Sequence, residues 1–304
     1  MLTGLLKMEP TSIYFLDDYW VSRGNKKLLN YMGPPLKENL PLADVKKFAR
    51  KKGVLCLMWN YDHDYTKEGP WFRCICDKAD YDISQIERKK IRYYIRCGLT
   101  KCTIRQVDFQ WLADNGYNTY VNAASRYNNF TVETKERFRE RMLAYKNVPN
   151  SEAFGAFVDE NLAAFMTVFI YGDSVLNPRA HFDPAYSDFC PMYALYYWAA
   201  KHYLTEKGYK EFDRGERHLA HETNFDEFLL RMGYRKVYCR LGLYMAFPVR
   251  LILGIIRVFR KILKAILPNR SYFILESLML FQDIATATKK IGDAPSIRIS
   301  ARSK

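Results

Sequence analysis

The chain has 304 residues, of which 49% are hydrophobic and 26% are charged, and its formal net charge at pH 7 is +14. This composition supports one or two globular domains with buried cores. Because repeats and low-complexity tracts are absent, it excludes a fibrous or largely disordered protein. The positive charge favours a polyanionic partner such as nucleic acid, an anionic membrane or a phosphate-rich substrate, unless it only keeps the surface soluble.

The seven cysteines indicate a reducing environment, because they form no CxxC pair and no regular framework. We expect buried thiols rather than disulfides, and no metal, since a zinc site needs four ligands at a recognisable spacing. Residues 1–7 are not followed by the apolar core of a signal peptide, and no run of 18 apolar residues suggests a transmembrane helix. The sequence therefore predicts a cytoplasmic protein.

The first half alternates short apolar runs with charged segments that have helical spacing. Strands are predicted at residues 12–16, 54–59, 71–76 and 101–107. Helices are predicted at residues 40–52, 83–97, 109–115 and 131–145. Pro and Asn cluster at residues 147–150, so we place a boundary there between an N-terminal α/β half, residues 1–146, and a C-terminal half, residues 147–247.

The second half predicts the order β-β-β-α-β-α-β. Its strands are expected at residues 154–158, 162–171, 174–181, 209–213 and 234–247, the first two joined as a hairpin. The first helix begins at Pro191, where a missing N–H costs nothing, and stops before Gly208. The second helix spans about 224–232 and is closed by Gly233.

This order resembles the C-terminal half of GNAT-type acyltransferases, and most closely the Fem-like peptidyltransferases and related acyltransferases of bacterial polysaccharide gene clusters. The resemblance rests on PMYALYYWAAKHYLTEKGYKEFDRGER at 191–217 and FDEFLLRMGYRKVYCRLGLY at 225–244. WFRCICDKADYDISQIERKKIRYYIRCGLTKCTIRQVD at 71–108 adds an aromatic-started strand and a basic IRxGL segment, so residues 59–247 are covered. It implies an α/β (α+β) fold with tandem GNAT-like halves and mixed sheets flanked by helices, the N-terminal half being degenerate.

The resemblance also implies an opening between the fourth and fifth strands that holds an acyl donor, with its phosphates at the start of the next helix. Free N–H groups and the helix dipole favour an anion there. In this chain the intervening loop, residues 182–190, contains two Asp and no Gly, unlike the basic, glycine-rich loop that binds acetyl-CoA. Fem-like proteins also lack that loop and take aminoacyl-tRNA, which the net charge of +14 would suit. Acyl-CoA, an acyl carrier protein and aminoacyl-tRNA all stay open as donors.

The charged residues after the strand at 209–213 are the candidates for chemistry, because acyl transfer to an amine needs a proton acceptor and oxyanion donors. The candidate catalytic residues are Asp213, Glu216, His218 and His221. The candidate donor-binding residues are Arg179, Arg214 and Arg217. The alternative is a solvated charged loop between strand and helix.

Residues 248–292 form a predicted helical tail, followed by a disordered end at 293–304. Within the tail, residues 250–267 predict a helix with Lys and Arg on one side and apolar residues over the rest. One interpretation is a peripheral anchor on anionic lipid at the inner membrane face. The other is a helix packed on its own domain or on a partner.

These patterns together predict an enzyme. We expect an N-acyltransferase that moves an acyl or aminoacyl group, from a thioester or an aminoacyl-tRNA, to an amine of a cell-wall or polysaccharide precursor. The alternative is a non-catalytic basic protein that binds membrane or RNA through a decayed GNAT-like fold. An opening between the fourth and fifth strands favours the enzyme, and an opening filled by Tyr and Trp favours the alternative.

Overall fold

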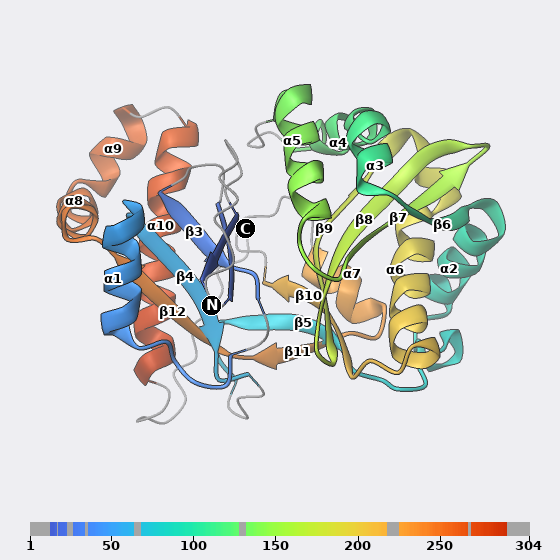
Figure 1. The fold of residues 1–304 in the computed structure, drawn as a ribbon, viewed down its shortest axis with the longest axis horizontal. Helices are drawn as coiled ribbons and strands as arrows, with labels where there is room; N and C mark the ends of the chain where they lie inside the picture. Colours follow the sequence, from blue (N-terminus) through green and yellow to red (C-terminus); the bar gives the residue numbers. More distant parts are fainter. Residues whose placement is uncertain are drawn as a thin grey trace. The chain divides into compact units, whose positions relative to one another are not determined.

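The computed structural model describes residues 13–16, 18–22, 27–33, 36–63, 68–127, 132–217, 225–266 and 269–290. The chain forms two compact units, one made of Met1–Phe72 with Val237–Lys304 and the other of Arg73–Lys236. Each unit contains a mixed sheet flanked by helices (Figure 1), which confirms the α/β class with two mixed sheets and a C-terminal helical tail.

The second unit is built on a seven-stranded sheet with the order β11-β5-β10-β9-β8-β7-β6. The strands are β5 (Phe72–Cys76), β6 (Thr103–Val107), β7 (Ser151–Val158), β8 (Asn161–Tyr171), β9 (Ser174–Phe182), β10 (Glu211–Glu216) and β11 (Arg235–Tyr238). β7 and β8 form the predicted hairpin, whose turn residues Asp159 and Glu160 adopt positive φ values of 47° and 63°. β9 and β10 pair in parallel, because α6 (Pro191–Lys201) connects them across one face.

Helices cover both faces of this sheet (Figure 1). Phe154 of β7 packs against Trp198 of α6, with ring centroids 5.0 Å apart. Phe157 of the same strand contacts Trp111 of α3 at 5.6 Å, so α3 and α6 lie on opposite faces. The α3 face also carries α4 and α5, and the α6 face carries α2 and α7. Their bounds are α2 (Lys89–Lys101), α3 (Phe109–Asn115), α4 (Tyr117–Ala124), α5 (Lys135–Lys146) and α7 (Phe225–Arg231).

The first unit is built on a five-stranded sheet with the order β1-β2-β3-β4-β12. The strands are β1 (Ile13–Leu16), β2 (Asp18–Ser22), β3 (Leu28–Tyr31), β4 (Cys56–Tyr61) and β12 (Arg240–Met245). Leu57 and Trp59 of β4 pack with α1 (Leu42–Lys52), whereas Cys56 and Met58 pack with α8 (Phe247–Val258) and α10 (Asn269–Lys290). Burial on both faces explains the continuous apolar run at residues 54–59.

Two predicted elements were wrong in extent. The single strand expected at 234–247 is two strands that join different sheets, β11 beside β5 and β12 beside β4, with Cys239 between them. The single helix expected at 250–267 is divided at Phe259 into α8 and α9 (Arg260–Ile266). In both cases an uninterrupted apolar pattern gave no sign of the break.

The compact units also divide the chain differently from the predicted domains. β6 precedes the expected boundary near residue 147 and β7 follows it, yet these strands pair directly within the second unit. The tail is not separate either, because Leu253 of α8 and Met279 of α10 share a core with Met245 of β12. The predicted disordered end, residues 293–304, lies outside the described residues. Among the helices that the structure describes, none is long and apolar enough to cross a membrane.

Candidate functional site

The two parallel strands of the second unit separate partway along their length. Their ladder covers three pairs and ends at Asp213↔Leu176. β9 then continues to Phe182, and its register against β8 shifts between the pairs Phe169↔Leu176 and Thr167↔Arg179. This shift is a bulge at residues 177–178, and bulges bend a strand and re-aim its side chains. The backbone of β9 therefore leaves β10 at the place where an opening between the fourth and fifth strands was expected.

Arg214 of β10 bridges the separated strands. One of its terminal nitrogens donates to the carbonyl oxygens of Asn177 and Pro178, at 3.2 and 3.5 Å. Its Nε donates to the hydroxyl of Tyr196 at 2.5 Å, and its guanidinium lies 4.8 Å from the ring centroid of Phe225. The guanidinium thus satisfies carbonyls beyond the end of the β9–β10 ladder.

Tyr196 and Asn177 continue this polar chain below the bulge. The Tyr196 hydroxyl donates to Oδ1 of Asn177 at 2.9 Å, and Nδ2 of Asn177 donates to the Thr167 carbonyl at 2.7 Å. Burial raises the pKa of Tyr196 to about 12, an effect that the charge of Arg214 partly offsets. Tyr196 is therefore a neutral phenol at pH 7, and it orients Arg214 rather than accepting a proton from a substrate.

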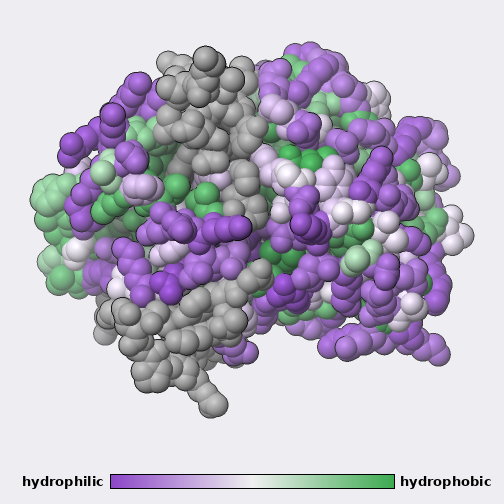
Figure 2. Space-filling model, turned by 60° about the horizontal axis from the view of Figure 1, so that its bottom comes forward, coloured by the Kyte–Doolittle hydropathy of each residue, from purple (hydrophilic) through white to green (hydrophobic). Residues whose placement is uncertain are grey.

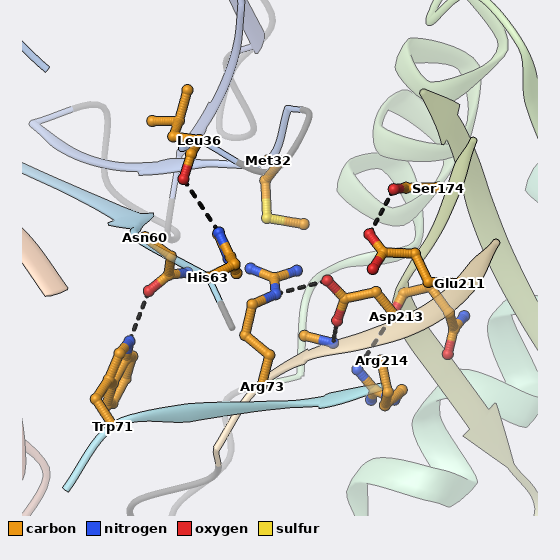
Figure 3. Close-up of polar contacts among 12 residues, drawn as sticks. Met32, Leu36, Asn60, His63, Trp71, Arg73, Ser174, Glu211, Asp213 and Arg214 are labelled. Atoms are coloured by element: carbon orange, nitrogen blue, oxygen red, sulfur yellow. Dashed lines mark hydrogen bonds and ion pairs between the residues drawn. The ribbon is translucent and has the colours of Figure 1, made fainter. Parts of the chain in front are cut away.

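Asp213, a predicted catalytic residue, is buried at 2% exposure, and both of its carboxylate oxygens are engaged. Oδ2 accepts from Nε of Arg73 at 2.6 Å, and Oδ1 accepts from the Gly215 amide at 2.7 Å. Figure 3 shows Arg73 of β5 and Asp213 of β10 pointing toward one another. Gly215 has φ +100°, which favours glycine, so the chain turns tightly around the carboxylate. This geometry ties β10 to β5.

The remaining predicted residues of the loop follow directly. Glu216 is half-buried at the end of β10, after a register shift that begins at Asp213, and it pairs with Arg73 in the ladder to β5. Arg217 is also half-buried and comes immediately after the strand. His218 and His221 lie outside the described residues, so the structure places two of the four catalytic candidates, Asp213 and Glu216, on one strand.

Arg179, the remaining donor-binding candidate, lies on β9 and faces α5 instead of α6. Its Nε donates to the Tyr145 hydroxyl at 3.2 Å, and proximity to Tyr145 raises the pKa of Arg179 despite burial. His181 follows two residues later, with its ring centroid 5.2 Å from that of Tyr120 and 5.1 Å from that of Phe165.

His181 is held in its neutral form. Burial, followed by the charges of Arg141, Arg179 and Arg214, lowers its pKa well below 6.5. Its Nε2 is buried and has no hydrogen-bond partner in the part of the chain that the structure describes. A neutral imidazole with so low a pKa is a weak proton acceptor but can still hydrogen-bond a substrate.

The segment before α6 differs from a glycine-rich phosphate loop. Residues 184–189 form a short 3₁₀ helix capped by the carboxylate of Asp183, and α6 then begins at Pro191 without a side-chain cap. All seven cysteines are free, and burial raises the pKa values of Cys74 and Cys76 to about 12, which confirms that those two are buried thiols. Over the described ranges, no group of His, Cys, Asp or Glu could hold a metal ion.

Sequence reasoning missed several residues of this site. Arg73 lies 140 positions from Asp213, and nothing in the local pattern of either strand indicates the other. Tyr196 was assigned to packing alone. A signal did exist for Arg141: its position three residues after Phe138 and four before Tyr145 places it on the inward stripe of α5.

Comparison with known proteins identifies the fold. No family model and no curated protein matches the sequence. Among solved structures, FemX is similar with a TM-score of 0.53 and 10% identity, over 80% of this chain and 87% of that one. The C-terminal domain of a putative lysylphosphatidylglycerol synthetase from Agrobacterium fabrum is similar with the same TM-score, identity and coverage. The chain has a Fem-like, GNAT-type fold. At 10% identity the likeness concerns the fold alone, and it confirms the predicted Fem-like GNAT arrangement.

Proposed function

We propose that this protein is an N-acyltransferase that transfers an aminoacyl group to an amine of a cell-wall or polysaccharide precursor. The observation that carries the proposal is the separation of β9 and β10 beyond Asp213↔Leu176, in a fold similar to that of FemX. A buried polar chain of Arg214, Tyr196 and Asn177 occupies the separation. Buried polar networks lower stability unless every group is satisfied, so their presence favours a functional site over a decayed one.

The reaction would be a direct transfer between two bound substrates. The amine nitrogen forms a bond to the acyl carbonyl carbon, the bond to the donor oxygen or sulfur breaks, and the amine gives up a proton. Among the described residues Glu216 is the proposed proton acceptor, with His218 and His221 as further candidates. Asp213 acts as a positioning residue through Arg73.

Arg214 and Arg217 are the proposed contacts to the donor's phosphates, with Arg179 on the other face of the sheet. Aminoacyl-tRNA is the donor that the features favour. The segment before α6 has no glycine, and the net charge of +14 suits a long polyanion. A thioester donor is the alternative.

Donor binding tests this proposal. We expect calorimetry to detect saturable binding of aminoacyl-tRNA at physiological salt, and weaker or no binding of acetyl-CoA and long-chain acyl-CoA. The Arg214→Ala/Arg217→Ala double variant should lose about 10-fold or more in affinity, since hydrogen bonds to charged groups are strong. An Arg139→Ala variant, whose exposed guanidinium pairs with Asp114 on α3, is the matched control. Equal binding by both variants would contradict the placement of the donor site.

The tail provides a surface that fits an anionic membrane. Leu253 of α8 is buried against the first unit, whereas most other large apolar residues of α8 and α9 are exposed. They are Phe247, Leu251, Ile252, Ile255, Val258, Phe259, Ile262 and Ile266. Figure 2 shows apolar side chains gathered at the left edge of the view, where α8 lies in Figure 1. Exposed patches of this kind mark binding surfaces.

Basic residues flank the patch and divide into two groups. Arg257 and Arg260 pair with Asp283 and Glu276 of α10, so they hold the helices together. Arg250 and Lys264 are exposed and available to lipid phosphates. Each basic residue near an anionic surface adds about 1 kcal/mol of binding. We therefore propose that α8 and α9 lie on a membrane that presents the acceptor.

Vesicle binding tests this surface. Phe247 and Val258 are 68% and 78% exposed, so changing both to Asp should leave the fold intact and lower affinity for vesicles containing anionic phospholipid about 10-fold or more. The control is Leu42→Asp, which removes a 52% exposed leucine from α1. Cosedimentation measures both. Unchanged binding by the double variant, or equal loss in the control, would contradict the proposed surface.

A further inference from the structure

Arg141 carries the least expected charge in the second unit. Its side chain is fully buried on α5, at 0% exposure. Nε donates to a carboxylate oxygen of Glu133 at 2.9 Å. Both terminal nitrogens are also buried, and neither has a hydrogen-bond partner among the described residues. Four N–H donors of a permanently charged group therefore point into the protein unsatisfied.

Such an arrangement is costly unless a ligand satisfies it. A buried ion without hydrogen bonds destabilises a protein by several kcal/mol as an order of magnitude, about 1–3 kcal/mol or more for each unmade bond. The rings of Tyr120 and Phe138 lie 5.5 and 5.3 Å from the Arg141 guanidinium and stabilise its charge. Ring faces cannot accept four in-plane N–H groups, so the demand for an acceptor persists.

The surroundings of Arg141 are positive and include a second unsatisfied donor or acceptor. Tyr120, which contacts the Arg141 guanidinium, also contacts the His181 ring, whose Nε2 is buried without a partner in the described part of the chain. The charges of Arg141, Arg179 and Arg214 all act on His181. Glu133 is the carboxylate that pairs with Arg141, and its side chain is 24% exposed. Three guanidinium groups thus exceed the nearby negative charge.

The geometry points to a subsite for a phosphate group, in which the terminal nitrogens of Arg141 donate to phosphate oxygens and His181 Nε2 completes the coordination. Guanidinium groups bind phosphate through paired N–H bonds, and a doubly charged oxyanion matches the excess positive charge better than a carboxylate does. The subsite lies on the α5 face of β9, across the sheet from α6. Resting on the proposed function, we assign it to a phosphate of the acceptor rather than of the donor.

Binding of small anions to the intact chain, without any acyl donor, tests the subsite. We expect inorganic phosphate to raise the melting temperature and to bind saturably by calorimetry, and acetate to bind more weakly. Arg141→Gln should lower phosphate affinity about 10- to 100-fold. Arg139→Gln, a change on the same helix at a 50% exposed position, should leave it unchanged. Glycerol phosphate and uridine diphosphate, compared side by side, distinguish a lipid-type phosphate from a nucleotide-type one.

A second variant keeps the test decisive if Arg141→Gln fails to fold. Glu133→Gln removes the competing carboxylate, so phosphate affinity should increase about 10-fold or less, as for one charge near a partly exposed site. Failure of phosphate to bind the wild-type chain, or unchanged affinity in both variants, would overturn the subsite. Phosphate binding without acyl transfer would leave the subsite standing and reject the proposed function, and acyl transfer with no effect of Arg141→Gln on acceptor KM would do the reverse.

Discussion

Asp213→Ala should destabilise the second unit by about 3–5 kcal/mol, because it removes the carboxylate that pairs with buried Arg73. The side chains of Arg73 and Asp213 are 10% and 3% exposed, so water cannot replace the lost partner freely. The Gly215 amide loses its acceptor in the same change. Urea unfolding followed by circular dichroism measures the effect.

Two further variants separate positioning from proton transfer at Asp213. Asp213→Asn keeps an acceptor for the Gly215 amide and loses the charge, so we expect an intermediate loss of stability. The double change Arg73→Met/Asp213→Leu should recover much of the loss, since apolar pairs often replace buried ion pairs without penalty. If Asp213→Ala melts like the wild type and loses activity, Asp213 is a proton acceptor and not a positioning residue.

Glu216→Gln should lower kcat for acyl transfer by about 100- to 10,000-fold, the usual contribution of a general base. Glutamine keeps the size and hydrogen-bonding shape of the side chain, so the melting temperature should stay close to that of the wild type. The matched control is Glu211→Gln at the other end of β10, where the carboxylate hydrogen-bonds Ser174 (Figure 3). Full activity in Glu216→Gln would transfer the role to His218 or His221.

Much of the second unit could be predicted from the sequence, because its elements carry local signals. The hairpin turn at residues 159–161, the proline that opens α6 and the glycine after α7 each mark an element boundary. The order of these elements was enough to indicate the Fem-like fold. Local signals act over a few residues, so they gave the elements and not the pairing between distant strands.

The arrangement of the site could not be predicted for the same reason. β5 precedes β10 by about 140 residues but lies next to it, and this neighbour converts Asp213 from a loop carboxylate into a buried ion-pair partner. The split of residues 234–247 also depends on distant partners, β5 for the first part and β4 for the second. Arg141 shows the opposite case, since helical spacing placed it inward but an inward arginine is easily taken for a surface one.

The measurement that tests the central claim most directly is acyl transfer itself. Purified protein would be incubated with aminoacyl-tRNA or acyl-CoA, together with amine-bearing cell-wall and polysaccharide precursors, and the products would be analysed by mass spectrometry. Our account predicts an amide product that forms with the wild type, depends on one donor class and falls sharply with Glu216→Gln. A donor that binds saturably while its acyl bond stays intact, in the wild type as in Glu216→Gln, would contradict it and favour a non-catalytic binding protein.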